Sequence, residues 1–379
     1  MKVGIMSMQR INNNGSYLQS YSLKRTLEQL GHEVVFVDYE VGRNLVGETP
    51  DEEGKFIKAK KKLVKKACDF IKVPRKKFKF QMKKQLDNYV KTYEEYEKEM
   101  LPLLGVGKKF LYRPKLDVLV IGSDEVFNCL QPNDEVGYSP QLFGAESRAK
   151  KVISYAATFG NTTGEGLKQY GIEDEIAGYL KNMAAISVRD AKSVELTEKL
   201  TGIHPYYHVD PVFLYDYSQE MKESVDLKDY IVVYSYWNRI NQQEARAIIA
   251  FAKKRQKKII TLAGLQSYLG EFVKANPFEV LSYVKNADYV ITDTFHGSVF
   301  SIKFNKKFVT LVREGTGKVY GNSNKLQDLL ERFGLSDRAI NDMNELERMM
   351  DEDIDYVPVN EKIAEEKEKS LEYLKTYVL

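Results

Sequence analysis

One of the chain's four histidines, His296, stands where an apolar run gives way to small polar residues, in the segment ADYVITDTFHGSVFSIKF at 287–304. The pattern predicts a buried strand over 289–292, followed by a helix that begins at Gly297. Gly297 permits a close approach of the backbone to a ligand, and Ser298 offers N–H and hydroxyl donors to an anion. A histidine at this edge can act as a proton donor or a cationic clamp, and a histidine that only caps the helix fits the same pattern.

Two arginines are placed to bind an anion. Arg189 follows an apolar run in ISVRDAKSVELTEKLTG, and Arg313 follows another in LVREGTGKVYGNSNK. The planar guanidinium group can pair with a carboxylate or a phosphate through two parallel hydrogen bonds. The alternative for Arg189 is a surface ion pair with Asp190 or Glu195.

A third polar cluster follows the apolar run DVLVIG, where the segment IGSDEVFN supplies Ser123, Asp124 and Asn128. Small hydrogen-bonding side chains of this kind suit the hydroxyl groups of a sugar. Ser123 or Asp124 would equally serve as the N-cap of a helix. The segment therefore predicts either a sugar contact or a helix start.

These residues need a scaffold that brings several strand ends together, and the sequence predicts one. Short apolar runs that end in polar or glycine-bearing loops alternate with helical patterns, as in α/β folds with buried parallel strands. Two such series predict two doubly wound domains that face each other across a cleft, where ligands of such sheets bind. We place the first domain at 1–210 with an insertion at about 50–110, the second at 211–355, and a C-terminal helix at 356–379 that packs back on the first.

The composition of the 379-residue chain is that of an ordinary globular protein, with 43% hydrophobic residues and a net charge of +3. No run of about 18 apolar residues is present, and the start MKVGIMSMQR shows neither the apolar region nor the cleavage site of a signal peptide. A cytoplasmic location is therefore expected. Cys68 and Cys129 lie far apart, so the sequence indicates neither a disulfide framework nor a zinc site.

The positive charge is concentrated in the segment 55–84, which carries fourteen Lys or Arg residues and a single acid, Asp69. Apolar and aromatic residues alternate with these cations, as in amphipathic segments that lie on anionic membranes. A solvated helical insertion explains the pattern equally well. No recognition motif for nucleic acid accompanies the lysines, so we expect no nucleic-acid partner.

Six segments of the chain, taken in order, resemble the polysaccharide pyruvyl transferase family. They are NNNGSYLQSYSLKRTLEQLGHEVVFVDY, DVLVIGSDEVFN, VISYAATFG, ISVRDAKSVELTEKLTG, VDPVFL and ADYVITDTFHGSVFSIKFNKKFVTL, and together they span most of residues 3–335. The resemblance implies a GT-B-like pair of Rossmann-like domains and an enzyme that transfers pyruvate from phosphoenolpyruvate to a sugar as a ketal. It also implies that His296 and Arg189 belong to the donor site and are catalytic.

The chain departs from the usual pattern of the family at two places. Members commonly have Gln and Trp in the GSD segment, where this chain has Glu125 and Phe127. Members also have a small residue and Pro before the last strand, where this chain has Asn305 and Lys307. These departures bear on which acceptor sugar is used.

The implied chemistry assigns the candidate residues to two sides of the cleft. A donor with a carboxylate and a phosphate needs cationic or N–H-rich groups, and no acidic cluster suggests a metal or other cofactor. The donor-side residues are Arg189, His296, Gly297, Ser298 and Arg313. All of them except Arg189 lie on the second domain. The acceptor-side residues, on the first domain, are Asn14, Gly15, Gln19, Ser123, Asp124 and Asn128.

The expected partners are phosphoenolpyruvate and a lipid-linked or nucleotide-linked sugar, in the biosynthesis of an exopolysaccharide or capsule. If the acceptor is lipid-linked, the basic segment would hold the enzyme on the inner face of the membrane. Two other functions remain open on the sequence. A GT-B-type glycosyltransferase would use a nucleotide sugar on the same fold, and a catalytically inactive module would only bind surface glycans.

Overall fold

The first domain of the computed structural model, which describes residues 1–46, 75–313 and 323–378, contains a parallel four-stranded sheet. Its strand order is β2-β1-β3-β4, with β1 (Lys2–Met6), β2 (Glu33–Phe36), β3 (Leu116–Ile121) and β4 (Ala149–Ser154). The short parallel pair β5 (Ser187–Val188) and β6 (Tyr206–Tyr207) continues beside β4 through bridges at Ala185 and Val188. Val3, Ile5, Val118 and Val120 are fully buried, as expected for strands covered on both faces.

The second domain contains a parallel six-stranded sheet, in the order β12-β11-β10-β7-β8-β9. Its strands are β7 (Tyr230–Ser235), β8 (Lys258–Ala263), β9 (Glu271–Phe272), β10 (Tyr289–Thr292), β11 (Lys307–Leu311) and β12 (Ala339–Ile340). Every residue of β7 is buried, and β10 and β11 are buried apart from their first residues. The strand order turns back on itself around β7 and β10, and ligands of such sheets bind at the carboxyl ends of strands at this kind of point.

Helices connect the strands and cover both sheets. Side-chain caps mark many of their starts, and Asn241 and Asn276 each form a capping box with a glutamate three residues later. In the first domain they are α1 (Asn14–Gln29), α3 (Arg75–Glu95), the π-helical turn η1 (Tyr96–Met100), α4 (Leu101–Leu104), α5 (Gly164–Gln169), α6 (Glu173–Lys181) and α7 (Ala191–Thr201). In the second they are α8 (Gln242–Lys254), α9 (Pro277–Asn286), α10 (Phe295–Lys303), α11 (Ser323–Arg332) and α12 (Leu346–Asp351). Among the described residues there are also four short 3-10 turns: η2 (Pro140–Phe143), η3 (Pro211–Phe213), η4 (Ser336–Arg338) and η5 (Met343–Glu345).

The two domains share one hydrophobic core around α1, η3 and α9. The ring of Tyr17 meets that of Phe278 edge to face at 5.8 Å, and the Tyr217 hydroxyl donates to the carbonyl of Leu18 at 2.8 Å. Residues of both sheets, such as Val3 and Val290, belong to the same buried cluster. The cleft between the sheets is therefore closed at its floor by apolar packing.

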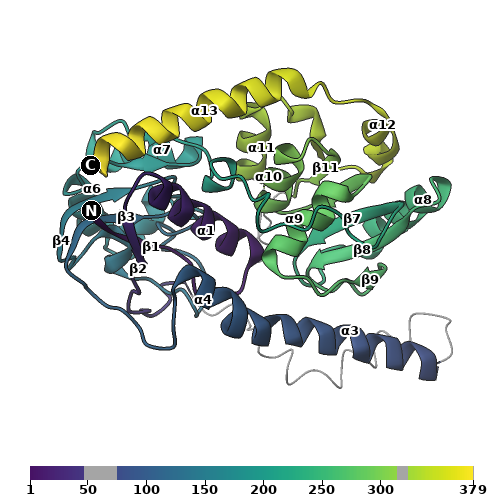
Figure 1. Cartoon of the computed structure of the whole chain (residues 1–379). Coiled ribbons are helices and arrows are strands. Elements are labelled where there is room, and N and C mark those ends of the chain that lie inside the picture. Colours follow the sequence, from purple (N-terminus) through teal and green to yellow (C-terminus); the bar gives the residue numbers. More distant parts are fainter. Residues whose placement is uncertain (47–74, 314–322, 379) are drawn as a thin grey trace.

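The C-terminal helix α13 (Tyr356–Tyr377) leaves the second domain and crosses back to the first, where the chain ends (Figure 1). The Tyr373 hydroxyl donates to the carbonyl of Ser154 at 2.7 Å, and Lys151 Nζ donates to the carbonyl of Tyr377 at 3.1 Å. The predicted fold class is confirmed: two Rossmann-like domains face a cleft in a GT-B-like arrangement, with a C-terminal helix crossing back. Among the described helices, none is long and apolar enough to cross a membrane.

Candidate active site

His296 lies in the first turn of α10, which begins at Phe295 and therefore earlier than the sequence pattern predicts. The N-cap is Thr294, whose side chain accepts the N–H of Gly297 at 2.9 Å. The capping function is thus performed by the threonine. The His296 ring, only 4% exposed, faces the start of α1 so closely that a Cβ on Gly15 would lie 2.1 Å from its Nδ1. Gly15 is therefore glycine because the imidazole occupies the space of a side chain.

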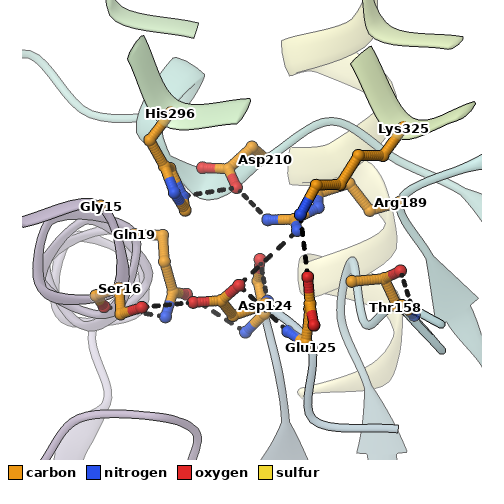
Figure 2. Close-up of polar contacts among 12 residues, drawn as sticks. Gly15, Ser16, Gln19, Asp124, Glu125, Thr158, Arg189, Asp210, His296 and Lys325 are labelled. Atoms are coloured by element: carbon orange, nitrogen blue, oxygen red, sulfur yellow. Dashed lines mark hydrogen bonds and ion pairs between the residues drawn. The ribbon is translucent and has the colours of Figure 1, made fainter. Parts of the chain in front are cut away.

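A buried carboxylate, Asp210, joins His296 to Arg189 (Figure 2). Arg189 Nη1 donates to Asp210 Oδ2 at 2.6 Å, and His296 Nε2 lies 3.4 Å from the same oxygen. The other carboxylate oxygen accepts the N–H of Val212 at 3.0 Å. Burial alone would raise the pKa of Asp210, but His296 and Arg189 together lower it, so the carboxylate is ionised at neutral pH.

The His296 Nε2 atom is within ion-pair distance of Asp210 but does not meet it in hydrogen-bonding geometry. It is a buried atom without a hydrogen-bond partner among the residues that the structure describes. A buried polar group in this state calls for an explanation, and a catalytic role is one. Nε2 therefore retains the capacity to exchange a proton with a ligand.

Arg189 is buried, at 6% exposure, and does not form the surface ion pair that was the alternative on the sequence. Its Nη2 lies 3.7 Å from Asp124 Oδ1, and its guanidinium carbon lies 4.1 Å from the centre of the Phe295 ring. Asp190 serves instead as the N-cap of α7 and accepts the N–H of Ser193. Stacking and two carboxylates fix the orientation of the guanidinium group.

The start of α1 brings polar groups of the first domain to the same place. Asn13 caps this helix and donates through Nδ2 to the Tyr236 hydroxyl of the second domain at 2.9 Å. Asn14 is the first residue of the helix. Ser16 Oγ donates to Asp124 Oδ2 at 2.5 Å, which places Asp124 between the serine and Arg189.

Three predicted acceptor-side residues lie behind this surface. Gln19 and Ser123 are fully buried, and the Ser123 N–H donates to Gln19 Oε1 at 3.2 Å. Gln19 Nε2 also donates to Ser7 Oγ at 2.9 Å. Asn128 is buried, and its Nδ2 donates to Glu125 Oε2 at 2.8 Å. These side chains hold the loop after β3 in position and do not line the cavity.

On the donor side, Gly297 and Ser298 are likewise occupied within the helix. The Gly297 N–H is bonded to Thr294, and the Ser298 hydroxyl donates to the Thr294 carbonyl at 3.1 Å. A Cβ on Gly297 would lie 2.1 Å from Thr292 Oγ1, so glycine is required here by packing against β10. In the first turn of α10, the backbone N–H groups of Phe295 and His296 have no partner within the helix.

Arg313 lies behind the cavity wall, in a cluster with two carboxylates. Its Nη2 is 3.0 Å from Glu244 Oε2, and its Nη1 pairs closely with Asp293. Burial lowers the pKa of the Arg313 guanidinium group, but the effect of Asp293 and Glu244 is larger and raises this pKa overall. Arg313 therefore stays charged. Of this cluster, Asp293 is the member that lines the cavity.

Lys325 of α11 forms an ion pair across the cleft that sequence reasoning did not foresee. Lys325 Nζ lies 3.0 Å from Glu125 Oε1 of the first domain (Figure 2). Burial would raise the pKa of Glu125, but Lys325, the Asn128 amide and Arg189 outweigh it and lower this pKa to about 2. The position where family members commonly carry Gln therefore holds a carboxylate with a cation of the second domain as its partner.

In the parent, the pKa of Glu125 falls from 4.5 to about 2 on folding. We therefore expect the Glu125→Gln variant to be less stable than the parent at neutral pH, by up to about 3 kcal/mol. A lowered pKa stabilises the fold fully above the unfolded value and loses this effect as pH falls through the folded value. The difference in unfolding free energy should therefore shrink between pH 4.5 and about 2. Denaturant titrations at several pH values measure it, with the exposed Glu368→Gln as control. A difference that does not change with pH would contradict the assignment.

A cavity of about 250 Å³ lies between the two domains. Carboxylates and cations both contribute to its wall, so its charge is mixed and not uniformly positive. The first domain contributes Met8, Ile11, Asn13, Ser16, Asp124, Glu125, Gln131, Asn133, Val136 and Arg189, and the second contributes Tyr236, Arg239, Asp293, Thr294, Phe295, His296 and Lys325.

Solved structures similar to this chain are distant relatives in sequence. The S. aureus MnaA structure with UDP is 8% identical, with a TM-score of 0.49 over 100% of this chain and 96% of that one. The Methanocaldococcus jannaschii UDP-GlcNAc 2-epimerase with UDP-GlcNAc and UDP is 12% identical, with a TM-score of 0.48 over 98% of this chain and 100% of that one. We draw no conclusion from similarities this low. Curated protein sequences gave no match.

The sequence model of one protein family, described as polysaccharide pyruvyl transferase, matches residues 13–315. The matched span begins at the cap of α1 and extends past His296, so it contains the residues that meet at the Asp210 carboxylate. It also covers most of the chain, as the order of the six segments predicts. The chain therefore belongs to the polysaccharide pyruvyl transferase family and is a transferase.

Proposed function

We propose that the enzyme transfers the pyruvyl group of phosphoenolpyruvate to a sugar of a cell-surface polysaccharide precursor, as a ketal, and releases phosphate. The observation that carries the proposal is the shared contact of Arg189 and His296 with Asp210 at the domain boundary. This arrangement offers an anion-binding fork and a proton-exchanging nitrogen side by side, next to a cavity lined by both domains.

The reaction requires one proton on carbon and two new C–O bonds. The methylene carbon of phosphoenolpyruvate takes up a proton and becomes a methyl group, which leaves the adjacent carbon electrophilic. One sugar hydroxyl adds to that carbon, the C–O bond to phosphate breaks, and a second hydroxyl of the same sugar closes the ketal. Of the two protons that the hydroxyls lose, one balances the proton now on the methyl group and the other leaves with phosphate.

His296 is the residue we assign to proton transfer at the methylene carbon, since its Nε2 is buried and has no hydrogen-bond partner among the described residues. The Asp210 carboxylate, 3.4 Å from Nε2, orients the imidazole toward the cavity. Arg189 binds the donor's carboxylate or phosphate through the guanidinium edge that Asp210 leaves available. Lys325 and Arg239, which also line the cavity, supply further positive charge for the phosphate.

The acceptor sugar would bind against the first domain, where Asn13, Ser16 and Asp124 line the cavity. We assign Asp124 to accept the proton of an attacking hydroxyl, because its carboxylate lines the cavity. A sugar linked to a nucleotide or a lipid is the acceptor class that we propose. That no metal or other cofactor takes part remains a prediction.

Phosphate release tests the proposed donor directly. We expect the protein to release phosphate from phosphoenolpyruvate only when a suitable acceptor is present, in a panel of nucleotide-linked and lipid-linked hexosides. The acceptor should gain the mass of a pyruvyl ketal. Transfer of a hexosyl group from a UDP-sugar or GDP-sugar in the same panel, with no reaction of phosphoenolpyruvate, would identify the enzyme as a glycosyltransferase instead.

We also propose that the enzyme acts in the cytoplasm, on precursors at the inner face of the membrane. The predicted basic segment at 55–84 lies largely outside the described residues, which resume at Arg75. Its contact with anionic lipid stays a prediction. Replacing Lys60, Lys61, Lys62, Lys65 and Lys66 by Gln would weaken such a contact and leave the turnover of a water-soluble acceptor unchanged.

A further inference from the structure

A second surface of the first domain has the properties of a membrane contact, and it lies within the described residues. Phe110, Leu111 and Tyr112 are consecutive large apolar residues with exposed fractions of 48%, 40% and 42%. Large apolar side chains scattered singly on a surface are ordinary, but a contiguous group marks an interaction site. We call residues 107–115, between α4 and β3, the aromatic loop.

The backbone of the aromatic loop is held in place while its side chains remain exposed. Leu111 exchanges two hydrogen bonds with Asp38, through its N–H to Oδ2 at 2.8 Å and through its carbonyl from the Asp38 N–H at 2.9 Å. Arg10 donates to the Gly107 carbonyl at 3.2 Å and lies 4.0 Å from the centre of the Phe110 ring. The Phe110 and Tyr112 rings stack 5.7 Å apart. These contacts fix the loop in a conformation that keeps its apolar side chains exposed.

The charge around these rings is positive. Lys108, Lys109 and Lys115 are exposed, and none of them forms an ion pair with a described residue. The acids that face the loop are all paired with arginines. Asp38 pairs with Arg10 at 2.6 Å, and Glu40 and Glu146 pair with Arg113 at 3.2 and 2.7 Å. Exposed lysines next to exposed aromatic rings match a surface that is anionic and has an apolar interior.

The position of the loop connects it with the cavity. Arg10, which anchors Phe110, belongs to the connection between β1 and α1. Met8, Ile11 and Asn13 of this same connection line the cavity. An acceptor held in a membrane at the aromatic loop would thus lie beside the wall of the site.

We propose that the aromatic loop docks the enzyme on an anionic lipid bilayer, with Phe110, Leu111 and Tyr112 inserted among the headgroups and the lysines on lipid phosphates. A second copy of the chain fits less well. A two-fold interface through this loop would bring the lysines of one copy against those of the other. The inference does not depend on the proposed donor, because lipid binding is measured without turnover.

Co-sedimentation of the full chain with vesicles tests the inference. The parent should bind phosphatidylglycerol-containing vesicles, bind pure phosphatidylcholine weakly, and lose affinity as salt rises. Each lysine near the surface contributes about a fivefold factor, so the K108Q/K109Q/K115Q variant should bind on the order of 100-fold more weakly. The matched control K228Q/K253Q/K258Q removes exposed lysines of the second domain and should bind like the parent.

The apolar part has its own variant and control. F110S/L111S/Y112S should weaken vesicle binding roughly tenfold or more, whereas Y170S/I249S/V357S, at other exposed apolar positions, should not. In a Trp237→Phe background, the tryptophan fluorescence of a Phe110→Trp variant should be quenched by brominated lipid. Thermal melts check that each variant folds.

Three results would overturn the inference. One is a parent protein that does not bind anionic vesicles. Another is an F110S/L111S/Y112S variant that binds them like the parent, which would leave the basic segment as the sole lipid contact. The third is a parent that dimerises in solution while this variant stays monomeric, which would make the loop an interface between copies.

Discussion

His296→Ala should lower turnover by about 10²- to 10⁴-fold, because it removes the group that delivers a proton to the donor. The fold should survive, since the imidazole fills a polar position at the start of α10, beside Gly15, and Thr294 provides the cap. Donor affinity should change much less than turnover, because Arg189 retains its contact with Asp210 at 2.6 Å.

Steady-state kinetics on parent and variant measure this effect, with circular dichroism as the test of folding. His204→Ala is the matched control, because His204 is an exposed histidine that pairs with Glu198 on the surface. The control should retain parental rates. A folded His296→Ala enzyme with near-parental activity would show that the histidine has only a packing role.

Arg189→Ala should act mainly on donor binding, at a cost of about 2 to 5 kcal/mol. The loss of donor binding has two causes. The donor anion loses the two parallel hydrogen bonds of the guanidinium group, and Asp210 keeps its negative charge in a buried position. Arg189→Lys keeps the charge but not the planar fork, so its donor affinity should fall between those of parent and Arg189→Ala. The KM for phosphoenolpyruvate and calorimetric titration of the donor report this directly.

Because Arg189→Ala removes a cation that neutralises the buried Asp210 carboxylate, the thermal stability of this variant must be measured alongside donor binding. Arg246→Ala removes an exposed arginine of α8 and serves as the control. If the Arg189→Lys variant is folded and binds phosphoenolpyruvate as tightly as the parent, Arg189 holds Asp210 in place but does not contact the donor.

The sequence predicts the scaffold well, because parallel strands covered on both faces must be apolar throughout. The run YVIT in β10 and its turn toward His296 are readable from hydrophobicity and from the small polar residues that follow. The return of α13 to the first domain was also foreseen. Its packing also contains a charge, since Glu366 is buried on α13 and pairs with Arg332 of α11. An apolar pattern alone does not reveal a buried charge that another element neutralises.

The connections within the site were harder to foresee, because they join residues far apart in the chain. Asp210 is the second residue of the segment VDPVFL, and nothing local indicates that it meets both Arg189 and a histidine of the other domain. Gln19 has the residue type of a sugar ligand and is instead fully buried behind Ser123. Side-chain type predicts which chemistry a residue can perform, whereas tertiary packing decides which residues face the cavity.

The source of the methyl proton is the most direct test of the proposed pyruvyl transfer. The reaction is run in D₂O with phosphoenolpyruvate and an acceptor, and the product is analysed by mass spectrometry after return to ordinary water, where exchangeable deuterium is lost. We expect an acceptor that carries a pyruvyl ketal with one deuterium on its methyl carbon, formed about 10²- to 10⁴-fold more slowly by the His296→Ala enzyme. A product that gains a sugar from a nucleotide donor, with no carbon-bound deuterium, would contradict the proposed pyruvyl transfer.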